Sequence, residues 1–355
     1  METERPHLAG TRRRAAVVTA ALTLAAGIAA SVPAHAEDAP CPTLRKLNIG
    51  VSVVPPNVVH TTPHVAKALG YFEKRCIDAN IMYFEGGQSQ TMASAISQGL
   101  AIGNVNDGMV AQGMKAKQIW GFAPLLPQAY TVAAEVKTPA DLKGKRLSAA
   151  GGGVGGFNWR MARAILEKAG IPLDDVIFVS QGLAGRLPGL VAGQLDGVAL
   201  HPEDVYLAEK QKPGLHVLVV LSEMMPDHVF NAYGGSVDMI AENRELLIDA
   251  AAAMIEANRT IYADKDKVIP IMVEATGKPR DAVEFAYDYL TKNCVWAVNT
   301  GFDKARTAWT AQYTVDSGDV PPEKKTTYDQ LVDQAIADAA VAKAGGPTTA
   351  GACKL

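Results

Sequence analysis

Two successive series of alternating strand-like and helix-like segments constrain the fold of this chain more than any other feature. The first series predicts strands over Lys46–Val54, Ile81–Phe84, Ala101–Val105 and Gln118–Ala123, and helices from Thr61 to about Lys74 and over Ser89–Gln98. Such alternation is typical of parallel sheets, because each crossover helix brings the chain back to the same edge of the sheet. It predicts an α/β lobe.

The second series repeats this pattern and is followed by a long helical segment. Its predicted strands are Tyr130–Val136, Arg146–Ala149, Val176–Val179, Gly197–Leu200 and His216–Leu221, and its predicted helices are Phe157–Ala169 and Leu187–Ala192. From Glu242 to about Val341 the apolar residues follow a mainly helical period. A chain of 355 residues with 48% hydrophobic residues can form two lobes of one architecture.

The first 36 residues have the layout of a secretory signal peptide. Arg12, Arg13 and Arg14 form a basic segment, an uncharged apolar stretch follows, and Ala34 and Ala36 occupy the −3 and −1 positions of a cleavage site. The apolar stretch is shorter than the ~20 residues that a membrane-spanning helix needs. We therefore expect export to the periplasm, with cleavage after Ala36.

Charge and cysteine spacing exclude two classes of protein. A formal net charge of −3 does not favour a nucleic-acid-binding face. The four cysteines form no Cys-x-x-Cys pair, so a structural zinc site is not expected.

An oxidising compartment favours pairing of all four cysteines, which allow three connectivities. Cys41 precedes the first predicted strand and Cys76 precedes the second, and neighbouring parallel strands begin at the same edge of a sheet. We therefore predict the disulfides Cys41–Cys76 and Cys294–Cys353, the second of which would hold the C-terminal tail to the helical part.

The glycine run Gly151–Gly156 fits the dinucleotide-binding pattern Gly-x-Gly-x-x-Gly between a strand and a helix. A run of glycines satisfies any glycine spacing, however, and the next strand ends in Val179-Ser180-Gln181 without the acidic residue that would bind a ribose. We therefore expect no cofactor. The run is interpreted as a loop whose backbone N–H groups can approach an anion, with a flexible turn as the alternative.

Polar residues follow the predicted strands of the first series. Asn57 and His60 follow the first strand, Gln88 and Ser89 the second, and Asn106 and Asp107 the third. Ligands of open parallel sheets lie outside the carboxyl ends of the strands, so these loops point to one place. For Asn106 and Asp107, a role as helix caps is an equal alternative.

Arg186 is the candidate anion ligand of the second series. It lies among small residues immediately before a helix, where a guanidinium can bind a carboxylate, sulfonate or phosphate, and a surface ion pair is the alternative. His201 and Glu203 follow a strand, but no second histidine lies at metal-ligand spacing, so no metal is expected. Trp120 and Trp159 could stack on a flat ligand, but core packing is the preferred interpretation.

Several motifs, in this order, resemble those of the periplasmic solute-binding proteins of ABC importers, in particular the nitrate/sulfonate/taurine type. The matching stretches are His64–Glu73, Tyr83–Gly87, Ala101–Val105, Thr138–Arg146 and Leu190–Gly197. The chain departs from the family at Cys76, where a glycine is usual, and in the longer loop Val53–His60.

The resemblance implies a two-lobed, type II periplasmic-binding-protein fold, shared with the thiamine-pyrimidine synthase-like proteins, with a mainly parallel sheet flanked by helices in each lobe. The expected parts are a signal peptide (1–36), the first part of lobe 1 (37–125), lobe 2 (126–230), the mainly helical second part of lobe 1 (231–342) and a tail (343–355). The chain crosses between lobes near Pro124–Ala129 and Met225–Tyr233, where we expect a hinge.

The resemblance also implies a monomeric binding protein, without enzymatic activity, that captures a small organic solute and delivers it to an ABC permease in the inner membrane. A sulfonate or carboxylate is favoured. Carried over by position, the ligand-binding residues are Asn57, His60, Gln88, Ser89, Asn106, Asp107, Gly155, Phe157, Asn158, Arg186, His201 and Glu203.

Two alternatives stay open. His60, Phe157 and Trp159 keep a pyrimidine precursor or another aromatic solute in consideration. An enzyme related to pyrimidine synthase would have the same fold, but that branch depends on a dense cysteine motif, whereas the four cysteines of this chain are widely spread and follow an export signal.

We predict that the mature protein begins at Glu37. N-terminal sequencing of the exported protein should give a chain without residues 1–36, and exported protein that retains Arg12 would contradict this expectation.

Overall fold

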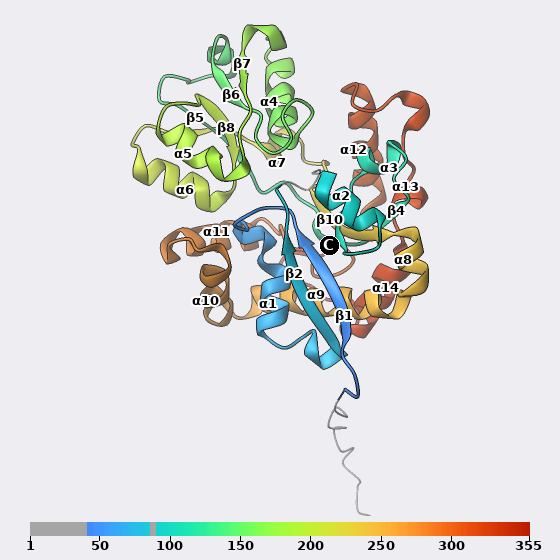
Figure 1. Ribbon diagram of the computed structural model, residues 1–355. Coiled ribbons are helices and arrows are strands. Elements are labelled where there is room, and N and C mark those ends of the chain that lie inside the picture. The colour runs from blue at the N-terminus through green and yellow to red at the C-terminus, as the bar shows by residue number, and fades with distance from the viewer. Residues whose placement is uncertain (1–40, 86–89) are drawn as a thin grey trace, which may run out of the picture. The chain divides into compact units, whose positions relative to one another are not determined.

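The computed structural model describes residues 41–85 and 90–355, and Cys41–Leu355 forms one compact unit (Figure 1). The predicted signal peptide and two of the predicted ligand-binding residues, Gln88 and Ser89, lie outside the described residues.

The strands of the described residues confirm both predicted series, with boundaries that differ by a few residues. They are β1 (Arg45–Val51), β2 (Ile77–Tyr83), β3 (Gly103–Asn104), β4 (Ala116–Ala123), β5 (Ala129–Val132), β6 (Arg146–Ser148), β7 (Ile177–Val179), β8 (Gly197–Leu200), β9 (His216–Val220) and β10 (Asn231–Ser236).

Helices separate the strands and make up most of the C-terminal part. They are α1 (Thr62–Ala68), α2 (Gln90–Ser97), α3 (Asp107–Ala111), α4 (Phe157–Lys168), α5 (Arg186–Val191), α6 (Pro202–Gln211), α7 (Leu221–Met224), α8 (Val237–Glu242), α9 (Arg244–Ala263), α10 (Lys265–Thr276), α11 (Arg280–Lys292), α12 (Lys304–Asp316), α13 (Tyr328–Leu331) and α14 (Gln334–Lys343). Short 3-10 turns, such as Val58–Thr61, lie between them.

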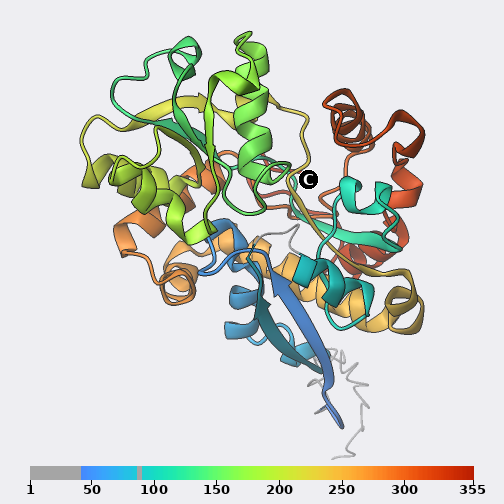
Figure 2. The same ribbon diagram turned by 45° about the horizontal axis from the view of Figure 1, so that its top comes forward.

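The two lobes have the same strand order. In lobe 1, β1 pairs in parallel with β2, a parallel bridge between Ile49 and Ile102 leads to β3, and β10 lies antiparallel between β3 and β4. In lobe 2 the order is β7-β6-β8-β5-β9, and β5 is antiparallel to both of its neighbours. Both views show the elements from β5 to α7 gathered apart from β1, β2, α1 and α9 (Figure 1 and Figure 2).

This arrangement confirms the predicted two-lobed α/β fold. The sheets are mixed rather than mainly parallel as predicted, because in each lobe one strand, β5 or β10, pairs antiparallel with both of its neighbours. This strand directly follows a crossing between the lobes. That strand has entered from the other lobe and therefore runs against its neighbours.

The sequence did not predict β10, because its sequence Asn231–Ser236 includes two consecutive glycines and few β-branched residues. Packing explains one of these glycines. A Cβ at Gly234 would lie 2.4 Å from the Lys117 carbonyl oxygen and 2.6 Å from a Val105 methyl group. Glycine is thus required where β10 passes between its neighbours, although glycine weakens a strand elsewhere.

The core of lobe 1 surrounds α9. The four consecutive alanines Ala250–Ala253 are fully buried, so the helix is covered on every side. The buried Asn258 amide donates to the Phe122 and Ala297 carbonyl oxygens (3.2 and 2.8 Å), and this contact ties α9 to β4 and to the segment after α11. Trp120 and Trp159 are buried, as the core interpretation predicts.

The C-terminal part also contacts lobe 2. Trp309 and Tyr313 of α12 pack against the core of lobe 2. Just after α12, both carboxylate oxygens of Asp319 accept hydrogen bonds from Arg163 of α4, each at 3.1 Å. The C-terminal helices therefore contribute to the alignment of the two lobes.

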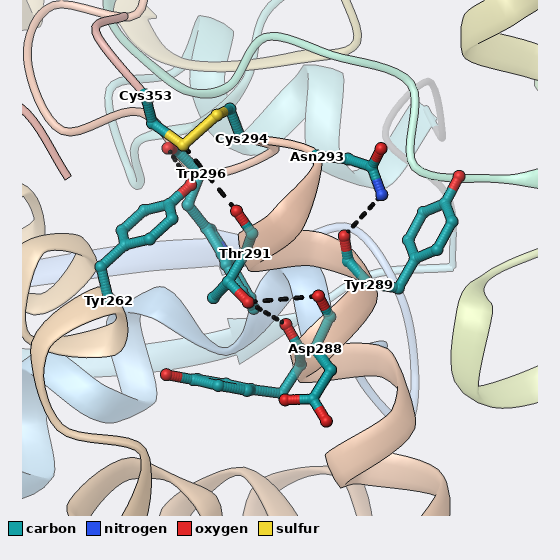
Figure 3. The surroundings of a disulfide bond; sticks show 9 residues. Tyr262, Asp288, Tyr289, Thr291, Asn293, Cys294, Trp296 and Cys353 are labelled. Atoms are coloured by element: carbon teal, nitrogen blue, oxygen red, sulfur yellow. Dashed lines mark hydrogen bonds between the residues drawn. A yellow bond between two sulfur atoms is a disulfide. The ribbon is translucent and has the colours of Figure 1, made fainter. Parts of the chain in front are cut away.

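Both predicted disulfides, Cys41–Cys76 and Cys294–Cys353, are present. Figure 3 shows the second of them. Among the described residues, Cys76 (φ 56°) and Cys294 (φ 53°) are also the only non-glycine residues with a positive φ. Cys76 follows a 3-10 turn at the position where a left-handed glycine commonly ends a helix. The cysteine that replaces the usual glycine therefore keeps the glycine-like backbone and adds a covalent link to the N-terminal segment.

We predict that glycine at position 76 offsets part of the loss of the first disulfide. Removal of this link, which spans 35 residues, should cost about 4 kcal/mol of unfolding free energy. Cys41→Ser with Cys76→Gly should then be about 1 kcal/mol more stable than Cys41→Ser with Cys76→Ser, because only glycine adopts the left-handed conformation without penalty. Urea unfolding measures both values, and equal stability of the two double variants would contradict the backbone argument.

Candidate functional site

A cavity of about 110 Å³ lies between the two lobes. Both lobes, both crossings and α12 contribute to its walls. The lining residues are Ser52, Val53, His60, Asn104, Asn106, Asp107, Gln128, Gly151, Phe157, Asn158, Arg160, Leu183, Arg186, His201, His228, Val229, Phe230, Asn231, Thr310, Tyr313 and Thr314.

The two crossings run side by side at the cavity. The Leu221 N–H donates to the Gln128 carbonyl oxygen (3.1 Å), and the Phe230 N–H donates to that of Pro124 (3.1 Å). These backbone contacts place the Gln128 and Phe230 side chains in the cavity wall. The segments that the sequence predicts as hinges are thus also part of the site.

Three rings form one wall. The His60 and His201 rings lie 5.5 Å apart, and the Phe230 ring is 6.0 Å from His60 and 6.1 Å from His201. Phe157, at the start of α4, meets Phe230 edge to face at 5.9 Å. Because His60 belongs to lobe 1 and His201 to lobe 2, this wall spans the gap between the lobes.

An amide side chain contacts one ring nitrogen of each of the two histidines. The Asn231 Nδ2 atom lies 3.2 Å from His60 Nε2, and the Gln128 Nε2 atom lies 3.2 Å from His201 Nε2. With the amides in this orientation, each amide N–H donates to an unprotonated Nε2, and each neutral ring carries its hydrogen on Nδ1. Neither Nδ1 has a hydrogen-bond partner within residues 41–85 and 90–355.

Burial keeps these rings neutral. It lowers the pKa of His60 from 6.5 to about 3, and the Arg186 guanidinium contributes to this shift. Burial and Arg186 also lower the pKa of His201 well below 6.5. On the α12 side, burial and Arg160 lower the pKa of His228 to about 4. The histidines therefore act near neutral pH as polar groups without charge.

Arg160 supplies a positive charge that is only weakly compensated. Its nearest carboxylate is Asp319 at 3.9 Å, and Arg163 already binds both oxygens of that carboxylate. The Nε–H of Arg160 is buried and, among the described residues, has no acceptor. Because Arg160 is also one of the residues that line the cavity, this N–H is a candidate donor to a solute.

Two amide oxygens are available as acceptors. Asn158 donates through Nδ2 to the Ala150 carbonyl oxygen (3.1 Å), which leaves Oδ1 as the free atom. Neither Asn158 Oδ1 nor Gln128 Oε1 has a partner in the part of the chain that the structure describes. A buried polar atom without a partner costs about 1–3 kcal/mol, so this cavity favours a polar occupant.

Behind the cavity wall lies a buried cluster that joins the lobes. Asn57 of lobe 1 donates through Nδ2 to Glu203 Oε1 (2.7 Å) and Asp204 Oδ2 (3.3 Å) of lobe 2. Its Oδ1 accepts from Arg186 Nη2 (3.4 Å). Lys278 of lobe 1 also pairs with Asp204. Burial and the adjacent Asp204 carboxylate raise the pKa of Glu203.

Further polar contacts join α6 to the start of α11. Both the Tyr206 hydroxyl (2.9 Å) and the Lys210 ammonium (2.6 Å) donate to Asp281 Oδ2. With the Arg163–Asp319 pair, the lobes are thus in contact on the α6 side and on the α12 side of the cavity.

The structure brings most of the predicted site residues together. His60, Asn106, Asp107, Phe157, Asn158, Arg186 and His201 line the cavity. Asn57 and Glu203 instead lie in the interlobe cluster, and Gly155 is exposed in the loop before α4, so these three do not line it. Of the glycine run, only Gly151 reaches the cavity.

Two predicted roles need correction. The guanidinium of Arg186 is not unpaired. Its Nε donates to the Leu183 carbonyl oxygen (3.0 Å) and its Nη1 to that of Ala199 (3.3 Å), in addition to the contact with Asn57. Asn106 caps α3 by accepting from the Met109 N–H (3.0 Å), which was the alternative for that residue.

The sequence does not predict several residues of the cavity wall, among them Arg160, Gln128, the residues His228–Asn231 and the α12 residues. The sequence contains a partial indication of these residues. Arg160 lies one helical turn after the predicted ligand-binding residue Phe157, and the crossings are predicted as hinge segments. The α12 residues are more than 75 positions from the nearest other wall residue in the chain, and no local pattern marks them.

We predict that the neutral histidines make the protein less stable in mild acid. A pKa lowered by folding contributes stability above the unfolded value of 6.5 and loses it as the pH falls, because only the unfolded chain binds the proton there. His60 alone should account for about 2 kcal/mol between pH 7 and pH 5.

Urea unfolding of wild type and of His60→Gln at these two pH values tests this. The loss on acidification should be smaller in the variant by about that amount. His216→Gln, outside the cavity, is the matched control and should follow wild type. Equal losses in wild type and His60→Gln would contradict a neutral, buried His60.

Within the described ranges, no group of three or more His, Cys, Asp or Glu residues is arranged to hold a metal ion. No helix among these residues is long and apolar enough to span a membrane.

Solved structures with this fold include binding proteins and an enzyme. The alkanesulfonate-binding protein SsuA from Xanthomonas axonopodis pv. citri, bound to MOPS, is 16% identical with a TM-score of 0.64, and the match covers 81% of this chain and 98% of that one. The periplasmic nitrate-binding protein NrtA from Synechocystis PCC 6803 is 13% identical, with a TM-score of 0.62 and coverage of 84% and 88%. The desulfurization enzyme DSZB is 16% identical, with a TM-score of 0.60 and coverage of 84% and 99%.

These similarities show the fold of ABC-type periplasmic binding proteins. Among curated proteins there is no significant sequence match. The family profile described as NMT1/THI5 like matches residues 57–267, more than half of the chain. The chain therefore belongs to the NMT1/THI5-like family.

Proposed function

We propose that this protein is the extracytoplasmic substrate-binding component of an ABC transporter. It captures a small organic anion, a sulfonate or a carboxylate, between its lobes in the periplasm and delivers it to a permease in the inner membrane. The observation that carries this proposal is a polar cavity between two lobes in which buried N–H groups of Arg160, His60 and His201 face no protein acceptor in the described residues.

An anion supplies the missing acceptors. Sulfonate and carboxylate oxygens accept several hydrogen bonds at once, and bonds between charged partners are the strong ones. Arg160 provides charge, whereas the neutral imidazole N–H groups provide direction. The fold shared with sulfonate- and nitrate-binding proteins is in accord with this role.

The cavity size weighs against a substituted aromatic solute. An engineered protein cavity that accepts benzene has a volume of about 150 Å³, which exceeds the ~110 Å³ here. The rings of His60, His201 and Phe230 therefore serve as walls for a smaller solute.

The cysteines weigh against an enzyme that depends on a thiol. All four cysteines of the chain form disulfides, and none of them lines the cavity. A structure that shares the fold with the desulfurization enzyme DSZB can thus serve for binding alone.

Ligand capture and lobe closure are coupled in this proposal. The cavity wall combines residues of both lobes, so that the solute completes its contacts only when the lobes meet. The crossings at 124–128 and 225–230 absorb the rotation, and the permease recognises the closed form.

We predict that Arg160→Gln weakens binding of small anions. With ethanesulfonate and propanoate as probes, titration calorimetry should show at least a tenfold loss of affinity, as expected for a buried bond to a charged group. Arg163→Gln is the matched control. It removes a guanidinium one helical turn away that binds the same Asp319 but does not line the cavity, so it should lower stability and leave affinity within threefold.

Small-angle scattering of the wild type should show a smaller radius of gyration with a saturating probe. Failure of wild type to bind these anions or any hydroxylated form of them, or an unchanged affinity in Arg160→Gln, would refute the proposed anion site. Binding without any compaction would refute closure as the signal.

A further inference from the structure

We infer that the solute is a compact hydroxy acid, an anion whose short carbon chain also carries a hydroxyl group. This inference rests on the proposed function and names the substrate class of the same cavity. It follows from the kinds of polar atoms that the cavity presents, which include acceptors as well as donors.

Asn158 is the acceptor whose orientation is fixed. Its Nδ2 is committed to the Ala150 carbonyl oxygen, so the atom that faces no partner among the described residues is the carbonyl oxygen Oδ1. The side chain is 1% exposed, and water does not solvate it freely. An anion without an O–H or N–H group leaves this oxygen without a donor.

Gln128 and His201 together leave one donor and one acceptor free, whichever way the Gln128 amide is oriented. If the amide donates to His201 Nε2, the free atoms are the Gln128 oxygen and the His201 Nδ1–H. If the amide is turned over, the ring donates instead, and the free atoms become an amide N–H and an unprotonated Nδ1. Each state presents one donor and one acceptor, so the solute must offer both.

The charge of the cavity favours a hydroxyl group over an ammonium group as the donor. The free acceptors are neutral amide oxygens, while the guanidinium groups of Arg160 and Arg186 both line the cavity. Asp107 is the one carboxyl group in the wall. It accepts from the Thr314 hydroxyl (2.6 Å) and lies near Arg160, and burial raises its pKa. A second cation in this space would be repelled by Arg160, whose charge is only weakly compensated.

The volume limits the carbon chain. An engineered protein cavity of about 150 Å³ holds one benzene molecule, so a cavity of about 110 Å³ has room for a solute of about benzene's size at most. An acid group with a chain of two or three carbon atoms and one hydroxyl group fits this description.

Matched pairs of ligands test the inference on the unmodified protein. Titration calorimetry compares 2-hydroxyethanesulfonate with ethanesulfonate and 2-aminoethanesulfonate, and 2-hydroxypropanoate with propanoate. In at least one pair, the hydroxylated anion should bind at least tenfold more tightly than its parent and than the amino compound.

The outcomes separate this inference from the proposed function. Parents that bind as tightly as their hydroxylated forms overturn the hydroxy-acid assignment and leave the anion-binding function in place. Tighter binding of the amino compound overturns the charge argument. If none of the anions binds, the proposed function fails and the inference fails with it.

Two variants locate the hydroxyl group. Gln128→Met and Asn158→Leu keep the side-chain volume but remove the free oxygen. At least one of these variants should reduce the preference for the hydroxylated anion over its parent to threefold or less, while the parent still binds. Gln98→Met, just after the end of α2 and outside the cavity, makes the same chemical change as Gln128→Met and should keep the full preference. A preference that persists in both cavity variants would overturn the assignment of these two oxygens as acceptors of the hydroxyl group. If either variant does not fold, the ligand pairs measured on wild type remain decisive.

Discussion

The side-chain amide of Asn57 is the contact on which the closed arrangement of the lobes depends. It accepts from Arg186 and donates to Glu203 and Asp204, so that one small neutral group satisfies a buried cation and two buried carboxyl groups of the opposite lobe. Buried charges are tolerated only with such partners. Because Arg186 also lines the cavity, the interlobe contact and the binding site share a residue.

This arrangement gives a physical basis for the coupling that we propose between binding and closure. With the lobes in contact, His60, His201, Gln128 and Asn158 are buried, and each retains a polar atom without a partner among the described residues. Such atoms disfavour closure over an empty space, whereas a solute with matching donors and acceptors removes the penalty. A ligand shifts an equilibrium only through its differential affinity for the two states, and these atoms provide that difference.

Elements outside the cavity also support the proposed coupling between binding and closure. The crossings place β5 and β10 antiparallel within otherwise parallel sheets, so that each crossing is anchored in the middle of a sheet. From the C-terminal part, α12 packs on lobe 2 while the Cys294–Cys353 disulfide holds the tail to lobe 1. Movement of the lobes must therefore be absorbed in the short segments 124–128 and 225–230, where Gln128 and Phe230 face the cavity.

The sequence alone determined the two-lobed fold, nearly all of its strands and both disulfides, because local periodicity and the edge positions of strands are encoded by near neighbours in the chain. Of the twelve ligand-binding residues that the family resemblance implies, seven line the cavity. The sequence could not determine β10, whose glycines serve the close approach of Lys117 and Val105. It also could not show that Arg186 is held by carbonyl oxygens and by Asn57, or that Arg160 and α12 face the same space. Those facts depend on which distant segments meet, and only the packing of the two lobes decides which polar atoms keep a partner and which remain free for a solute.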